Sequence, residues 1–132
     1  GDVLTLVDHC PDVPFVLDHI SKPDIKAGLM EPWATQITQL AAYPNVECKI
    51  SGVATEADHG AWTREDLKPY IDHVITAFGI DRVMYGGDWP VSLLATTYVD
   101  WVETLFWATA DLGAEAQDKL FRQNARRFYR LP

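Results

Sequence analysis

The sequence predicts a protein of the α/β class, in which parallel strands are connected by helices. Three short runs of strand-forming residues recur along the chain, at 14–19, 45–51 and 82–88. Longer stretches with apolar residues at helical spacing separate them, which indicates a helix after each strand. Connections of this length join parallel strands through right-handed crossovers. No repeat or flexible linker interrupts the alternation, so we expect one continuous domain over residues 1–132.

The segments beside the strands have the features of amphipathic helices. Residues 3–10 fit the end of a helix that leads into the first strand. Pro32 suits a first helical position, and the residues that then share one face are Trp33, Ile37, Leu40 and Ala41. The next helix is expected to begin near Asp66, because Pro69 then falls in its first turn, and to end at Gly79.

Two more helices are expected after the third strand. The apolar residues that mark the first, which Gly113 would end, are Tyr98, Trp101, Val102, Leu105 and Leu112. The residues that mark the last helix are Leu120, Phe121, Asn124, Ala125 and Phe128. Two architectures fit this order: an open doubly wound sheet, or part of a (β/α)8 barrel, whose units average roughly 31 residues. Three strands leave open sheet edges in either case, and an open edge favours a partner.

Charge and composition exclude several classes of function. The formal net charge is −8, which would repel a nucleic acid, and no basic run suggests binding to a membrane surface. No stretch approaches the ~20 apolar residues of a membrane span. Cys10 and Cys48 lie among apolar residues without metal-type spacing, which favours two reduced thiols in a cytoplasmic protein.

Polar residues occur near the end of each predicted strand. Strand alternation places His19 with Phe15 and Leu17, and Asp88 with Met84 and Gly86. The second strand has Glu47, Lys49 and Ser51 on one face. Ligands of α/β folds bind at the carboxyl ends of parallel strands. We therefore predict that His19, Lys49 and Asp88 contribute to one site.

Each of these residues also has a purely structural interpretation. Asp88 follows two glycines that permit close approach of a ligand, but it could instead cap the turn before Pro90. His19 could be a histidine with only structural hydrogen bonds, and Lys49 could pair with Glu47. Further candidates are Lys22 as a substrate contact, Trp89 as a pocket wall, and the loop residues Glu56, Asp58 and His59. His9 and His73 are expected on helix surfaces.

Three segments together resemble the amidohydrolase-related metal-dependent hydrolases, most closely their sugar-lactonase branch. They are 15–23 (FVLDHISKP), 48–52 (CKISG) and 82–91 (RVMYGGDWPV), and 123–129 (QNARRFY) also fits. The resemblance covers nearly the whole chain. It implies a TIM barrel, with residues 1–132 as the C-terminal part of one domain, containing about its last three strands.

The resemblance also implies roles for the polar residues. Asp88 matches the acid after the last strand, which activates water and contacts a divalent metal, zinc or manganese. His19 matches a histidine that binds metal or polarises the carbonyl group. Lys22 and Lys49 match cationic substrate contacts, and Trp89, a further substrate-binding candidate, directly follows Asp88 in the third motif. The implied reaction is lactone hydrolysis, in which a carboxylate activates the attacking water.

One family feature is missing from the sequence. The His-x-His pair of the first barrel strand has no counterpart among His9, His19, His59 and His73, so we expect the N-terminal strands to lie outside this sequence. This chain alone is then expected to be inactive, and to require its missing N-terminal half or a homo-oligomer. The alternatives are a decarboxylase or hydratase of the same superfamily, and a non-catalytic half-barrel that assembles with a partner.

Overall fold

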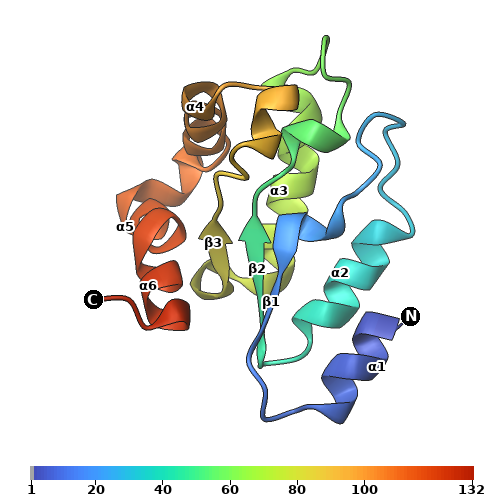
Figure 1. Ribbon diagram of the computed structural model, residues 1–132, viewed down its shortest axis with the longest axis vertical. Coiled ribbons are helices and arrows are strands. Elements are labelled where there is room, and N and C mark those ends of the chain that lie inside the picture. The colour runs from blue at the N-terminus through green and yellow to red at the C-terminus, as the bar shows by residue number, and fades with distance from the viewer. Residues whose placement is uncertain (1) are drawn as a thin grey trace.

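The computed structural model describes residues 2–132, which form a three-stranded parallel sheet with helices packed around it (Figure 1). The strands, in their spatial order, are β1 (Phe15–Leu17), β2 (Val46–Ile50) and β3 (Val83–Tyr85). The α-helices are α1 (Asp2–His9), α2 (Trp33–Ala41), α3 (Arg64–Phe78), α4 (Tyr98–Ala108), α5 (Gly113–Asp118) and α6 (Asn124–Tyr129). Because spatial order follows chain order, the strands are arranged as consecutive β/α units, as predicted.

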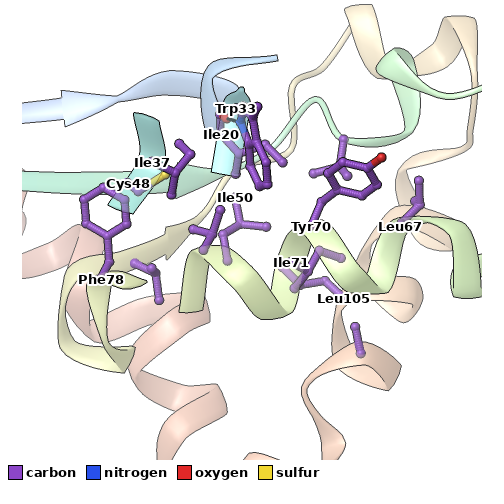
Figure 2. Packing of buried hydrophobic residues seen from close by; sticks show 14 of the residues in the cluster. Ile20, Trp33, Ile37, Cys48, Ile50, Leu67, Tyr70, Ile71, Phe78 and Leu105 are labelled. Atoms are coloured by element: carbon purple, nitrogen blue, oxygen red, sulfur yellow. Dashed lines mark hydrogen bonds between the residues drawn. The ribbon is translucent and has the colours of Figure 1, made fainter. Parts of the chain in front are cut away.

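The core lies between one face of the sheet and helices α2 and α3. The residues of β2 that point to this face are fully buried, and Figure 2 shows Cys48 and Ile50 beside Ile37 of α2 and Ile71 of α3. Leu17 lies next to Cys48 in the strand register and therefore points the same way. The opposite face of β2 carries Glu47, Lys49 and Ser51. In a barrel, the face without helices lines the interior.

Helix α3 begins two residues earlier than expected. Its N-cap is Thr63, whose hydroxyl and backbone N–H both donate to the Asp66 carboxylate at 2.8 Å. This capping box fixes the start of the helix at Arg64. Pro69 consequently lies inside the helix rather than in its first turn. It is exposed, so water can reach the carbonyl group that has lost its amide donor.

The segment after β3 differs from the two expected helices. Trp101 and Leu105 are buried as predicted, but α4 ends at Ala108, and Leu112 is exposed in the short turn that follows. Gly113 does not end α4 itself: with φ at +82° it ends the 3-10 turn Ala110–Leu112 and is the first residue of α5. A π-helical turn over Lys119–Gln123 then connects α5 to α6. None of the helices within residues 2–132 has the length and apolarity needed to cross a membrane.

Arg82, just before β3, joins the helices to the sheet. Its guanidinium donates to the carbonyl of Ala41 at 2.8 Å and to that of Tyr43 at 2.9 Å. It also donates to the carbonyls of Val46 and Phe78, both at 3.1 Å. These carbonyls end α2, begin β2 and end α3, so one side chain satisfies acceptors from three elements. Arg82 thereby fixes the N-terminal side of the sheet.

Candidate active site

His19 is placed by an unusual turn at the end of β1. The four residues 19–22 all have positive φ, between 44° and 60°, although none is glycine. The turn is held by Ile20, whose side chain is fully buried and whose carbonyl accepts a 2.6 Å hydrogen bond from Trp33 Nε1. The Lys22 N–H closes the turn by donating to the His19 carbonyl at 2.9 Å.

This turn corrects the alternation argument for His19. Phe15 and Leu17 belong to the helix-facing side of the sheet, because Leu17 is in register with Cys48. Continued alternation would direct His19 toward the core. The strand ends at Leu17 instead, and the left-handed turn brings the imidazole to the carboxyl edge of β2, where Nδ1 lies 2.9 Å from Ser51 Oγ.

Asp88 approaches the same point from the other side of β2. β3 ends at Tyr85, and Gly86 continues beside β2, where a Cβ atom would lie only 2.7 Å from the Ser51 Cβ. The Asp88 side chain is only 12% exposed, and its Oδ1 lies 3.7 Å from His19 Nδ1. Within residues 2–132 the carboxylate caps no turn; the Ser92 N–H donates instead to the backbone carbonyl of Asp88, at 2.8 Å.

Gly52 allows His19 and Asp88 to meet above the central strand. It follows Ser51 and has φ of +57°. A Cβ atom at this position would lie 2.9 Å from Asp88 Oδ2 and 3.0 Å from His19 Nδ1. Any side chain here would therefore intrude between the imidazole and the carboxylate. The sequence predicted neither this role nor the contact of Ser51 with His19, and the only signal was a glycine directly after a strand.

Lys49 has a different partner from the one considered in the sequence. Its Nζ lies 2.6 Å from Asp18 Oδ1 and 5.6 Å from the centre of the Tyr129 ring. Glu47 instead pairs with Arg127, at 2.9 Å. Desolvation lowers the pKa of Lys49, but its hydrogen bonds and charge interactions with Asp18 and Tyr129 outweigh this effect and raise the pKa. The amine is thus charged and directed toward Asp18.

The other candidates lie at the rim of the site. Lys22 Nζ donates to Glu56 Oε1 at 2.7 Å, and Lys26 pairs with Asp58 at 3.2 Å. These pairs connect the loop after β1 to the loop after β2. The hydrogen bonds from Lys26 and from the backbone of Gly60 lower the pKa of Asp58. Trp89 is 69% exposed, so its ring is not a core packing element.

The remaining histidines lie away from this site or make local contacts. His9 is exposed on α1, as expected. His73 is half-buried, because its Nε2 lies 2.9 Å from the Ala34 carbonyl and its ring packs on Trp33. His59 Nε2 contacts the Thr55 carbonyl at 2.9 Å.

The potential metal ligands of this site are few. Across residues 2–132, no three side chains of the types His, Cys, Asp and Glu are grouped closely enough to hold a metal ion. His19 and Asp88 therefore form a set of two donors. Both cysteines are free thiols, and burial raises the pKa of Cys48.

The sequence matches a family model and several curated proteins. The model described as amidohydrolase matches residues 2–131. The L-fucono-1,5-lactonase of Burkholderia ambifaria is 39% identical over 98% of this chain and 46% of its own length. That of Burkholderia multivorans is 37% identical over 99% of this chain and 51% of its own. The chain spans about half the length of these relatives.

Solved structures give the same family and fold. A zinc-bound amidohydrolase from Burkholderia multivorans superposes with a TM-score of 0.93 at 33% identity, over 99% of this chain and 49% of that chain. A putative 2-pyrone-4,6-dicarboxylic acid hydrolase from Pseudomonas putida has a TM-score of 0.77 at 21% identity, over 98% and 48%, which supports the fold alone. The predicted family resemblance and the partial (β/α)8 barrel are thereby confirmed.

Proposed function

Because the chain belongs to the amidohydrolase family, we propose that it supplies the catalytic carboxylate of a hydrolase that opens a sugar lactone. The observation that carries this proposal is the 3.7 Å approach of Asp88 to His19 at the carboxyl edge of the sheet. A carboxylate and an imidazole placed there can manage the protons of an ester hydrolysis. The two lactonase relatives, at 39% and 37% identity, support a lactone as the substrate.

In the proposed reaction, Asp88 accepts a proton from water as the water oxygen bonds to the lactone carbonyl carbon. The tetrahedral intermediate then collapses, and the bond between this carbon and the ring oxygen breaks. Asp88 returns the proton to the leaving ring oxygen, which yields a hydroxy acid. Asp88 suits this role because its side chain is only 12% exposed yet hydrogen-bonds no other side chain of residues 2–132.

A divalent metal, zinc or manganese, fits this site only as part of a larger ligand set. An imidazole and a carboxylate are both zinc ligands, but catalytic zinc sites use three protein ligands, and His19 and Asp88 are two. The zinc-bound relative supports the proposal that these two residues hold a metal together with ligands from outside this chain. Such a metal would polarise the carbonyl group and acidify the bound water.

Three residues are proposed to contact the substrate. Trp89, which is 69% exposed, offers an apolar wall next to Asp88. Lys22, whose side chain is 58% exposed, can direct its charge toward a substrate oxygen if it exchanges Glu56 for the ligand. The side chain of Lys49 is less mobile because its amine is paired with Asp18. We propose that this amine contacts the substrate while it stays paired with Asp18.

The rest of the barrel is proposed to come from outside residues 1–132. The relatives are about twice as long as this chain, which supports a missing N-terminal half. A homo-oligomer is the alternative source of further strands. The isolated chain is then expected to lack activity, and light scattering would distinguish a stable monomer from an assembly.

A substrate panel tests the proposed function. The complete protein is assayed with L-fucono-1,5-lactone and 2-pyrone-4,6-dicarboxylate, and with unsaturated carboxylic acids as substrates for a decarboxylase or hydratase. Turnover of a sugar lactone at a higher kcat/KM than every acid supports the proposal. Turnover of the acids without any lactone opening would replace it with the second enzyme class.

A further inference from the structure

The side chain of the fully buried Ser51 makes one hydrogen bond within residues 2–132, and that bond is with His19. Its Oγ lies 2.9 Å from His19 Nδ1 and has no other hydrogen-bond partner within residues 2–132. The serine is held from the side by β3, since a Cβ atom on Gly86 would approach its Cβ to 2.7 Å. The backbone of β3 therefore limits the positions that the Ser51 side chain can take.

This contact bears on which nitrogen of His19 carries the proton. A neutral imidazole has one N–H donor and one acceptor, whereas a serine hydroxyl can act in either role. A distance of 2.9 Å is consistent with both tautomers. Asp88 favours one of the two tautomers, because its Oδ1 lies 3.7 Å from the same Nδ1. A carboxylate stabilises an N–H group that faces it and repels a lone pair.

We propose that Ser51 is a positioning residue which, with Asp88, holds neutral His19 in the Nδ1–H tautomer. Nδ1 then donates to Ser51 Oγ, and Nε2 carries the lone pair. This arrangement is typical of histidines whose second nitrogen binds a metal or accepts a proton, because an oxygen acceptor fixes both the tautomer and the ring orientation. Nε2 has no hydrogen-bond partner within residues 2–132 that would oppose this use.

The consequence for catalysis rests on the proposed function. A bare Nε2 is a ligand or a base, and it is not a hydrogen-bond donor to a lactone carbonyl oxygen. The inference therefore favours His19 as a metal ligand or proton acceptor over His19 as the group that polarises the carbonyl directly. The tautomer itself can be measured without any turnover.

The experiment is nitrogen NMR of the complete protein, labelled with 15N-histidine and freed of divalent metal by a chelator, at a pH where the imidazole is neutral. The His19 signals are assigned by their loss in His19→Gln. We expect Nδ1 to resonate as a protonated, pyrrole-type nitrogen and Nε2 as an unprotonated, pyridine-type nitrogen. In Ser51→Ala the two signals should shift toward the averaged values of a ring that exchanges between tautomers.

A matched control and a wild-type measurement keep the inference testable. Ser92 is also a buried serine, with 3% exposure, and its hydroxyl has no hydrogen-bond partner within residues 2–132, so Ser92→Ala should leave both signals unchanged. A wild-type spectrum with the proton on Nε2 would overturn the inference even if Ser51→Ala fails to fold. A Ser51→Ala spectrum identical to wild type would overturn the role of Ser51. If lactone turnover is absent but the Nδ1–H tautomer is found, only the proposed function fails.

Discussion

Asp88 and His19 follow the two outer strands of the sheet, yet their side chains meet with 3.7 Å between Oδ1 and Nδ1. After each outer strand the backbone turns inward with positive φ, at 50° for Asp88 and 53° for His19. The two side chains therefore meet above the central strand β2. The meeting point lies over Gly52, where the absence of a side chain leaves room for both groups. This convergence is the basis of the predictions for Asp88 and Gly52.

The first prediction concerns Asp88. In the complete protein, Asp88→Asn should lower kcat for the lactone by about 10²–10⁴-fold, the usual contribution of a positioned general base. Circular dichroism and thermal unfolding should match the wild type. Asp81→Asn is the control, because Asp81 lies at the opposite end of the same strand and pairs with Lys119 at 2.9 Å. Wild-type turnover in Asp88→Asn would assign the base to another residue.

The second prediction separates backbone strain from crowding in the site. Gly28 and Gly52 both have positive φ, at 67° and 57°, but a Cβ atom on Gly28 would meet nothing within 4 Å. Gly28→Ala should therefore cost only the left-handed penalty, about 1 kcal/mol of unfolding free energy. Gly52→Ala should cost about 1–3 kcal/mol more, because its methyl group overlaps the imidazole and the carboxylate. Urea denaturation measures both, and equal losses would show that crowding at Gly52 is relieved without cost.

The third prediction concerns the half-buried Arg82. Arg82→Gln removes donors from four carbonyl groups and should destabilise the protein by about 2–5 kcal/mol. The control is Arg122→Gln, since Arg122 makes an exposed pair with Asp118 four residues away, and exposed pairs contribute little to stability. Chemical denaturation of both variants gives the comparison, and similar values would contradict a structural role for Arg82.

The fourth prediction is a pH dependence of stability. Hydrogen bonds from the backbone and hydroxyl of Thr63 lower the pKa of Asp66 in the folded protein. A lowered folded pKa stabilises the fold above the unfolded pKa, and this stabilisation is lost as the pH falls through the folded value. Stability measured from about pH 6 to about pH 2 should therefore fall less steeply in Asp66→Asn than in the wild type. Parallel curves of stability against pH for the two proteins would show that the Asp66 carboxylate does not contribute to the pH dependence.

The fifth prediction concerns Trp89 as a substrate wall. Trp89→Ala should raise KM for the lactone about tenfold, the loss expected for one aromatic contact, with little change in thermal stability. Leu94→Ala is the control, because Leu94 is similarly exposed at 67% against 69% for Trp89, and we assign it no substrate contact. A large drop in melting temperature with unchanged KM would instead make Trp89 a packing residue.

The sequence was sufficient for the order of strands and helices as far as β3, because this order depends on local apolar periodicity and on residues such as Gly79 and Pro32. It was insufficient for contacts between distant segments. The pairing of Lys49 with Asp18 rather than Glu47 depends on strand register and on the turn after β1, and neither has a local signal. The extended start of α3 was missed because Pro69 was weighed without the capping box of Thr63 and Asp66.

The site residues were predicted from strand ends, and the structure brings His19 and Asp88 together by a route that alternation does not describe. Their catalytic and metal-binding roles stay predictions, as do the substrate contacts of Lys22, Lys49 and Trp89. Gly52 and Ser51 were not assigned roles, because each acts only through neighbours that other strands supply.

The left-handed turn at 19–22 has a bearing on how this protein could be engineered. Four consecutive non-glycine residues with positive φ each cost about 1 kcal/mol or more, so glycine at the exposed Ser21 would relieve part of that cost. A directed-evolution screen that rewards thermal tolerance alone would therefore favour glycine in this turn. The same change would loosen the backbone that orients His19, so thermal tolerance and turnover would be selected in opposite directions at these positions.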